Sequence, residues 1–198
     1  MAVRLGRQNP TTTVILPYSQ TKGSEAVTLY NKTGRTAQEW QVLQVNNILA
    51  FNSDGLWTHT KFGLAVPRRN GKNEVIVMRE MWGLEHGERI CHTAHRTTTS
   101  HAAYERLYRL LLDAGYTEVT RKKKEMPAHS FVASKVYGLE SIELTDGGVI
   151  HFRTRTNNGG LGEGFDLLVV DEAQEYTEKQ ESSLKYTVSD SQNPQIIF

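Results

Sequence analysis

Residues 61–73 read KFGLAVPRRNGKN, and this stretch decides the fold. Its first six residues are mostly apolar and predict a buried strand. A turn follows as far as Gly71, and from Lys72 to residue 84 the chain is apolar around most of its circumference, which predicts a helix packed on several sides. Such a strand–turn–helix unit binds polyphosphates because the helix N–H groups and the lysine ammonium point at the anion. We therefore predict a phosphate-binding loop here.

The loop departs from the standard pattern G-x-x-x-x-G-K-[ST] at two positions. Val66 replaces the first glycine, and Asn73 stands where a Ser or Thr hydroxyl would bind Mg²⁺. An asparagine amide oxygen can also bind Mg²⁺, although it is a neutral carbonyl on a longer side chain. We expect Asn73 to contact the ion directly or through water. Taken alone, the Asn-Gly-Lys sequence is equally typical of a surface turn.

A second motif lies at residues 167–172, which read LLVVDE. In phosphate-loop enzymes an Asp at the end of such an apolar strand holds Mg²⁺, and the adjacent Glu polarises the attacking water. Taken alone, two acids after a strand also fit the N-terminus of a helix, where negative charge is favoured. The two motifs occur in the expected order, each after its own strand. Together they favour a nucleotide-hydrolysing site.

The rest of the chain alternates between helical and extended patterns. We predict helices over 24–33, 36–51 and 97–114, a strand over 89–93, a β-hairpin over 142–144 and 149–152, and a strand that begins at Ile196. This alternation predicts a mainly parallel α/β sheet. We expect both motifs at the C-terminal ends of adjacent strands, where the ligand sites of such sheets lie. The basic run over 121–124, which could contact a DNA backbone, and the segment over 157–162 are predicted to be loops.

Composition narrows the class of protein. The chain has 198 residues, 38% of them hydrophobic and 23% charged, which fits one soluble globular domain. No run approaches the roughly 18 apolar residues that a membrane span needs. Cys91 is the sole cysteine, so no intramolecular disulfide can form and a reducing compartment is indicated. The net charge is +1, so a nucleic acid would have to be held by local patches.

With both motifs in view, residues 36–198 resemble the ATPase domain of the large terminase subunit of tailed bacteriophages. That domain belongs to the motor that packages DNA into the procapsid. The family's phosphate loop also lacks the first glycine and carries an arginine shortly after the strand, as residues 66–72, VPRRNGK, do here. Residues 168–174, LVVDEAQ, match the family's acidic motif, and Trp40-Gln41 matches its upstream glutamine motif.

The resemblance implies a P-loop NTPase fold of the α/β class. Its mainly parallel central sheet would be flanked by helices in three layers, with an inserted β-hairpin. Residues 1–35 would form an N-terminal arm and a short helix, and residues 36–198 the ATPase domain. The chain stops at the strand that begins at Ile196, before the family's coupling motif and without its nuclease domain. We therefore expect no DNA cleavage.

The resemblance also implies roles for single residues. Lys72 would bind the β- and γ-phosphates, and Glu172 would be the catalytic carboxylate. Asp171 and Asn73 would hold Mg²⁺. Gln41 would contact adenine.

The remaining implied roles belong to arginines and to the loop backbone. Arg68 would sense or stabilise the γ-phosphate. An arginine finger would come from a neighbouring subunit, with Arg153 and Arg155 as candidates. The other loop residues expected around the nucleotide are Pro67, Arg69, Asn70 and Gly71.

The function that the resemblance implies is ATP hydrolysis, with Mg²⁺, that drives double-stranded DNA into a procapsid. Expected partners are DNA, further copies of the chain in a ring, the portal protein and the small terminase subunit, with no membrane. The place of action would be the host cytoplasm, at the portal. Two alternatives stay open: a helicase-like, nucleic-acid-dependent ATPase, because the acidic motif is similar there, and a non-catalytic, nucleotide-binding assembly module.

Overall fold

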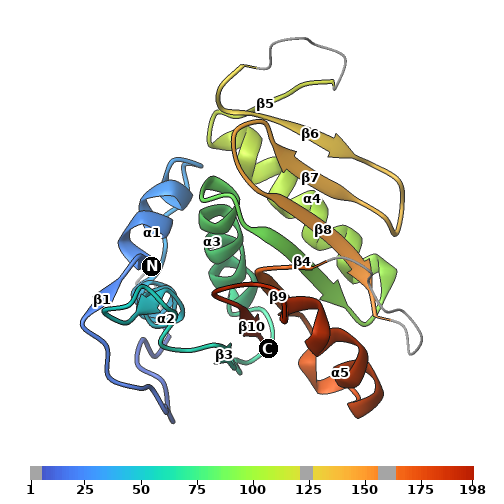
Figure 1. Cartoon of the computed structure of the whole chain (residues 1–198). Coiled ribbons are helices and arrows are strands. Elements are labelled where there is room, and N and C mark those ends of the chain that lie inside the picture. Colours follow the sequence, from blue (N-terminus) through green and yellow to red (C-terminus); the bar gives the residue numbers. More distant parts are fainter. Residues whose placement is uncertain (1–5, 121–126, 156–163) are drawn as a thin grey trace.

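The computed structural model describes residues 6–120, 127–155 and 164–198 (Figure 1). Within them, one sheet of eight strands has the order β3-β10-β9-β4-β8-β7-β6-β5. The strands are β3 (Lys61–Phe62), β4 (Arg89–Ala94), β5 (Thr117–Glu118), β6 (Ser130–Ser134), β7 (Ser141–Leu144), β8 (Val149–Thr154), β9 (Leu167–Val170) and β10 (Gln195–Ile197). All neighbours pair in parallel except at β7, which is antiparallel to both β6 and β8. The predicted α/β fold with a mainly parallel central sheet is confirmed.

The helices and a small second sheet complete the described chain. The helices are α1 (Gly23–Asn31), α2 (Glu39–Ile48), α3 (Lys72–Glu85), α4 (Thr97–Asp113) and α5 (Glu178–Leu184), with the 3₁₀ turns η1 (Ala173–Glu175) and η2 (Lys185–Val188). The second sheet pairs β1 (Gln20–Thr21) with β2 (Ala50–Phe51). Figure 1 places α1 and α2 beside α3, away from β6 and β7.

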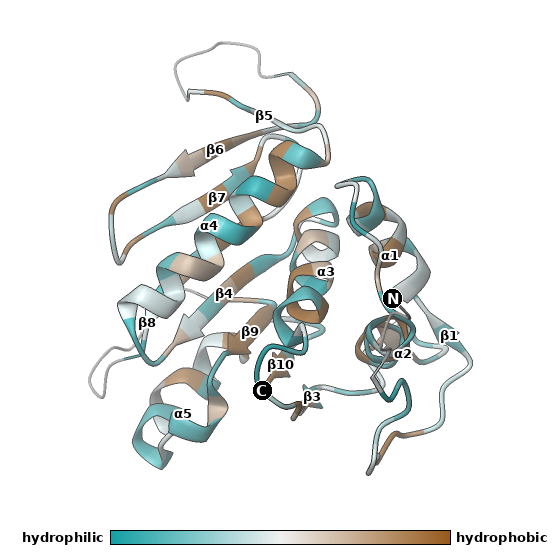
Figure 2. Cartoon of the chain, turned by 180° about the vertical axis from the view of Figure 1, so that it is seen from behind, coloured by the Kyte–Doolittle hydropathy of each residue, from teal (hydrophilic) through white to brown (hydrophobic). Residues whose placement is uncertain are grey.

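The sheet separates two hydrophobic cores, which gives the predicted three layers. Along β9, Leu167 and Val169 belong to the larger core, whereas Leu168 and Val170 belong to the smaller one. The larger core joins the sheet to α1, α2, α3 and α4, and the smaller one to α5 and η2. This two-sided burial explains the continuous apolar run of β9. Both β9 and β10 stand out as hydrophobic segments in Figure 2.

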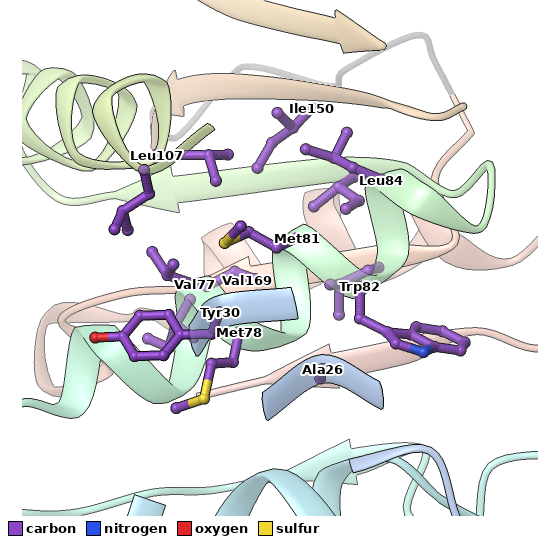
Figure 3. Packing of buried hydrophobic residues seen from close by; sticks show 14 of the residues in the cluster. Ala26, Tyr30, Val77, Met78, Met81, Trp82, Leu84, Leu107, Ile150 and Val169 are labelled. Carbon is purple, nitrogen blue, oxygen red and sulfur yellow. The ribbon is translucent and has the colours of Figure 1, made fainter. Parts of the chain in front are cut away.

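Helix α3, which begins in the phosphate loop, is the centre of the larger core. Its ten residues 75–84 are all buried, because the sheet lies on one side of the helix and α1 and α2 lie on the other. In Figure 3, Met81 and Leu84 of α3 point toward Leu107 of α4 and Ile150 of β8. The predicted helix packed on several sides is confirmed. This packing holds the first turn of α3 in place.

The predicted position of the two motif strands was wrong in one respect. The strands β3 and β9 are not adjacent, because β10 lies between them: Ile196 is paired with both Lys61 and Leu168. A strand of three residues at the end of the chain gives almost no periodic signal, so its insertion could not be seen in the sequence. The predicted hairpin, β7 and β8, extends the main sheet, since β8 also pairs with β4.

Several predicted boundaries also change. The helix over 36–51 is shorter, because α2 ends at Ile48 and the chain turns into β2. Of the strand predicted over 61–66, only Lys61–Phe62 form β3. Beyond it, one further backbone hydrogen bond, from Leu64 N to Phe198 O, joins this segment to the residue after β10. The run over 121–124 and the loop over 157–162 lie outside the described residues. The division at residue 35 stays a prediction.

A buried arginine fixes the end of α3 that is remote from the phosphate loop. Arg79 is fully buried and donates to both carboxylate oxygens of Glu88, at 2.7 and 2.9 Å. Its Nε donates to Gln195 Oε1 at 2.9 Å, and its guanidinium lies over the rings of Trp57 and Trp82. The group thereby connects α3 to β10 and to the start of β4.

We expect Glu88→Gln to lower the free energy of unfolding by about 3 kcal/mol, because it leaves a buried guanidinium without its counter-charge. Urea unfolding followed by circular dichroism measures the change. The matched control is Glu105→Gln, which breaks the exposed ion pair of Glu105 with Arg109 and should change stability by less than about 1 kcal/mol. Equal effects of the two substitutions would contradict the structural role of Arg79.

Candidate nucleotide-binding site

The predicted phosphate loop runs from the end of β3 to the first turn of α3. Gly71 is the N-cap of α3 and has φ +84°, a left-handed conformation that glycine adopts without strain. A Cβ at this position would lie 2.8 Å from Gln41 Nε2, so a side chain would collide as well as strain the backbone. The loop itself is fastened by Asn70, whose amide donates to Pro67 O at 3.0 Å. These contacts explain why the Asn-Gly pair precedes Lys72.

Lys72 and Asp171 meet across the end of the sheet. Lys72 Nζ lies 2.5 Å from Asp171 Oδ1, and 99 residues separate the two in the chain. Burial alone would raise the pKa of the Asp171 carboxyl, but the hydrogen bond and charge of Lys72 outweigh it and hold this pKa below the usual range. Asp171 is therefore an ionised carboxylate in a buried place, which is what a metal ligand must be.

Glu172 follows Asp171 in an unusual backbone conformation. Its φ is +55°, in the left-handed region that residues other than glycine rarely adopt. Its N–H donates to Asp171 Oδ1 at 2.9 Å, and its side chain is half-buried. The two acids of the motif therefore have different surroundings. The Asp171 carboxylate pairs with Lys72, and Glu172 is the residue at which the chain turns into η1.

Gln41 connects α2 to the phosphate loop. The residue is buried, its Oε1 accepts from Gln38 N at 2.8 Å, and its Nε2 donates to Gly71 O at 3.1 Å. Both ends of the amide therefore have protein partners in this structure. A contact between Gln41 and adenine stays a prediction, and it would require the amide to share or exchange one of these bonds.

A cavity of about 1150 Å³ opens beside the loop. This volume is ample for a nucleotide, since small-molecule sites measure about 300–1,000 Å³. The residues that line it include Gln41 and four of the predicted loop residues, Pro67, Arg69, Asn70 and Gly71. The structure therefore brings part of the predicted loop to this cavity, whereas Arg68, Lys72 and Asn73 and the acidic residues Asp171 and Glu172 are not among its lining residues. Arg68 is exposed.

The N-terminal arm forms part of the cavity wall, which the sequence did not indicate. Residues 6–15 all line the cavity. Two bonds fix the arm there: Trp40 N donates to Gln8 Oε1 at 3.2 Å, and Leu16 N donates to His59 Nε2 at 3.0 Å. No periodic pattern marks a segment held by such single contacts, so only the tertiary structure identifies it.

The first turn of α3 carries a second unpredicted feature. Glu74 accepts from the hydroxyl of Tyr30 at 2.6 Å and from Arg35 at 3.4 Å, and it forms a close ion pair with Arg106 of α4. Burial, followed by the hydrogen bond to Glu74, raises the pKa of Tyr30 to about 12, so this hydroxyl stays a donor. The carboxylate also lies near the positive end of the α3 dipole, where a negative charge is favoured.

A buried His–Glu pair lies close enough to Asp171 and Lys72 for their charges to act on the histidine. The Nδ1 of His92, on β4, is 2.6 Å from Glu80 Oε1 on α3. Burial alone would lower the pKa of His92, but the charge and hydrogen bond of Glu80 raise it, and the charge of Asp171 adds to this effect. The pair therefore adds a buried polar link between α3 and the strand next to β9.

The two arginines considered as finger candidates lie in different surroundings. Arg155 is buried and donates to backbone carbonyls of β4 and of the acidic motif. Arg153 is half-buried and donates to the carbonyls of Glu140 and Phe152. Neither side chain extends freely from the surface.

Comparisons with known proteins identify the fold. No family model and no curated protein matches the sequence. Among solved structures, the large terminase of bacteriophage HK97 is 12% identical with a TM-score of 0.66, over 90% of this chain and 37% of that one. The large terminase of a thermophilic bacteriophage, in complex with ADP, is 14% identical with a TM-score of 0.54, over 92% and 38%.

A third similar structure is the ATPase domain of a Thermus phage large terminase. It is 14% identical with a TM-score of 0.57, over 85% of this chain and 66% of that one. The chain thus spans less than half the length of the two whole terminases that it matches. The likeness shows that the chain has the fold of a terminase ATPase domain. Within the described residues, no helix has the length and apolar character of a membrane span.

Proposed function

We propose that this chain is the ATPase domain of a phage DNA-packaging terminase, which hydrolyses ATP to drive double-stranded DNA into a procapsid. The observation that carries the proposal is the contact between Lys72 of the phosphate loop and Asp171 of the acidic motif, 2.5 Å apart. Two segments predicted to act on one nucleotide lie together at one edge of a P-loop sheet. The three terminase structures with the same fold support the assignment, and one of them holds ADP.

The residues at the site fit ATP with Mg²⁺. Mg²⁺ prefers oxygen ligands, and Asp171 and Asn73 offer a carboxylate and an amide oxygen. The Asn73 amide forms no hydrogen bond with another residue in the described part of the chain, so it is free to take this role. When bound, Mg²⁺ neutralises charge that develops on the β- and γ-phosphates.

The protein's own groups would perform the rest of the reaction. The N–H groups at the start of α3 and the Lys72 ammonium would hold the β- and γ-phosphates, and Asp171 would exchange its bond to Lys72 for the metal. Glu172 would orient the attacking water and accept its proton. Gln41 and the arm over residues 6–15 would form the wall around the base and sugar. Arg68 would have to turn inward to reach the γ-phosphate.

The wider assignment rests on the fold likeness. We propose further copies of the chain in a ring, the portal protein and the small terminase subunit as partners, with action in the host cytoplasm at the portal. A motor that grips duplex DNA should hydrolyse slowly when isolated, because neighbours and DNA complete the site.

ATP turnover with different DNA substrates tests the proposal. The purified chain is assayed alone, with blunt duplex and with single strands of the same length. Stimulation by blunt duplex above single strands is expected. Stimulation by single strands alone would instead support the helicase-like alternative, and ADP binding without any turnover would support a nucleotide-binding assembly module.

Asn73 permits a test of the metal site in two directions. We expect Asn73→Ser, which restores the standard hydroxyl ligand, to lower the Mg²⁺ concentration for half-maximal turnover several-fold. Asn73→Leu, which is similar in size but has no ligand atom, should raise it. Mg²⁺ titrations at saturating ATP measure both. If neither variant differs from wild type, Asn73 has no role at the metal.

A further inference from the structure

The site contains a buried arginine, Arg155, for which the proposed mechanism needs no contact with ATP. We propose that Arg155 is a positioning residue that holds Glu172 in its catalytic conformation from within the same chain. This inference rests on the proposed function, because it assigns Arg155 to the ATPase reaction. It also removes Arg155 from the candidates for an arginine finger that reaches a neighbour.

The guanidinium of Arg155 binds three carbonyl groups where β4 and β9 end. Its Nη1 donates to Thr93 O at 3.0 Å and to Asp171 O at 2.7 Å, and its Nη2 donates to Glu172 O at 3.2 Å. Only 6% of the residue is exposed. Arg155 itself comes directly after β8, and its N–H donates to Ala94 O at 2.9 Å. The side chain therefore connects three neighbouring strands at the catalytic edge of the sheet.

Two of these carbonyls control the backbone of Glu172. The φ angle of Glu172 describes the rotation between the carbonyl carbon of Asp171 and that of Glu172, and Arg155 binds the oxygens of both groups. This φ is +55°, in a region that residues other than glycine rarely occupy without support. Because one rigid, planar guanidinium holds both carbonyls, it fixes the rotation that aims the Glu172 side chain.

The same geometry is incompatible with a finger. A finger must leave its own chain and place its donors on a neighbour's phosphate. For Arg155 this movement would break the three carbonyl bonds and would withdraw a buried side chain from beside the ring of Tyr176, which lies 5.8 Å from the guanidinium.

Thr154 supplies the control. It lies directly before Arg155, at the end of β8, and is half-buried. Its hydroxyl donates to Thr97 Oγ1, at the start of α4, at 3.0 Å. Within the described residues, its side chain forms no hydrogen bond with β9 or with the acidic motif. The substitution Thr154→Val therefore removes a hydrogen bond beside Arg155 without touching Glu172.

The experiment compares Arg155→Lys, Arg155→Met and Thr154→Val with wild type in ATP turnover and ADP binding. Misplacement of a catalytic group should lower kcat between about 10- and 100-fold. The KM for ATP and the Kd for ADP should stay within about twofold, because Arg155 contacts neither in the proposed mechanism. Thr154→Val should retain wild-type kcat. Arg155→Lys keeps the charge and tests the geometry should Arg155→Met fail to fold, and thermal unfolding monitors the fold of all three.

A mixing experiment separates positioning in the same chain from action on a neighbour. Arg155→Met is mixed with Glu172→Gln, and turnover is measured with duplex DNA. If Arg155 acts within its own chain, neither partner has a complete site and no turnover returns. Recovery in the mixture would overturn the inference, as would wild-type kcat in both Arg155 variants. A wild-type chain without turnover would overturn the proposed function and this inference with it. That result differs from failure of the inference alone, in which the wild-type chain is active.

Discussion

Replacement of Glu172 by glutamine is expected to lower ATP turnover by about 10²–10⁴-fold while ADP binding stays within twofold of wild type. The amide keeps the size of the side chain but cannot accept a proton from water. Glu172 is the half-buried acid of the motif, and its neighbour Asp171 is already engaged by Lys72. The loss should therefore fall on the chemical step and not on the binding of the nucleotide.

Steady-state kinetics and ADP titration of the same preparation measure both quantities. Glu175→Gln is the matched control, because Glu175 is an exposed acid three residues further along, in η1. Glu172→Gln with near wild-type turnover would contradict the role of this carboxylate. Weakened ADP binding with unchanged kcat would contradict it as well, since it would place Glu172 among the residues that bind the nucleotide.

The parts of the fold that could be predicted from sequence are those with local patterns. The apolar circumference of α3, the four apolar residues of β9 and the Gly-Lys turn each occupy a continuous stretch, so burial and turn chemistry can be read from neighbouring residues. The place of β10 between β3 and β9 has no such pattern. It depends on pairing between residues more than 100 positions apart, as between Ile196 and Lys61.

The same division holds for the site. Lys72 and Asp171 were predicted separately, each from its own motif, and the structure brings them into contact. The bonds of Gln41 to Gly71, of Arg155 to the acidic motif and of the arm to Trp40 each join segments that are distant in sequence. No local sequence pattern marks such contacts. From the sequence alone, an arginine at position 155 fits a finger, a surface group or a buried residue that binds backbone carbonyls.

The contact between Lys72 and Asp171 leads to the second large expected effect. In this structure Lys72 and Asp171 form an ion pair with each other. Bound nucleotide would need both groups, the ammonium for the phosphates and the carboxylate for Mg²⁺. Lys72→Met removes the ammonium and keeps most of the side chain's length. We expect turnover to fall by about 10²–10³-fold, because a preorganised positive charge at the transferred phosphate is lost. Affinity for ATP should fall as well.

The design must separate this catalytic loss from a structural one, because Lys72→Met also leaves Asp171 buried without its partner. Lys72 is what holds the pKa of Asp171 low against burial, so the variant should unfold at a lower temperature than wild type. In the double variant Lys72→Met/Asp171→Asn, no unpaired carboxylate remains, and we expect the midpoint of unfolding to recover without any return of turnover. Lys32→Met, at an exposed lysine directly after α1 that does not line the cavity, is the control for loss of a positive charge. Turnover that recovered together with stability would show that Lys72 serves the fold and not the phosphates.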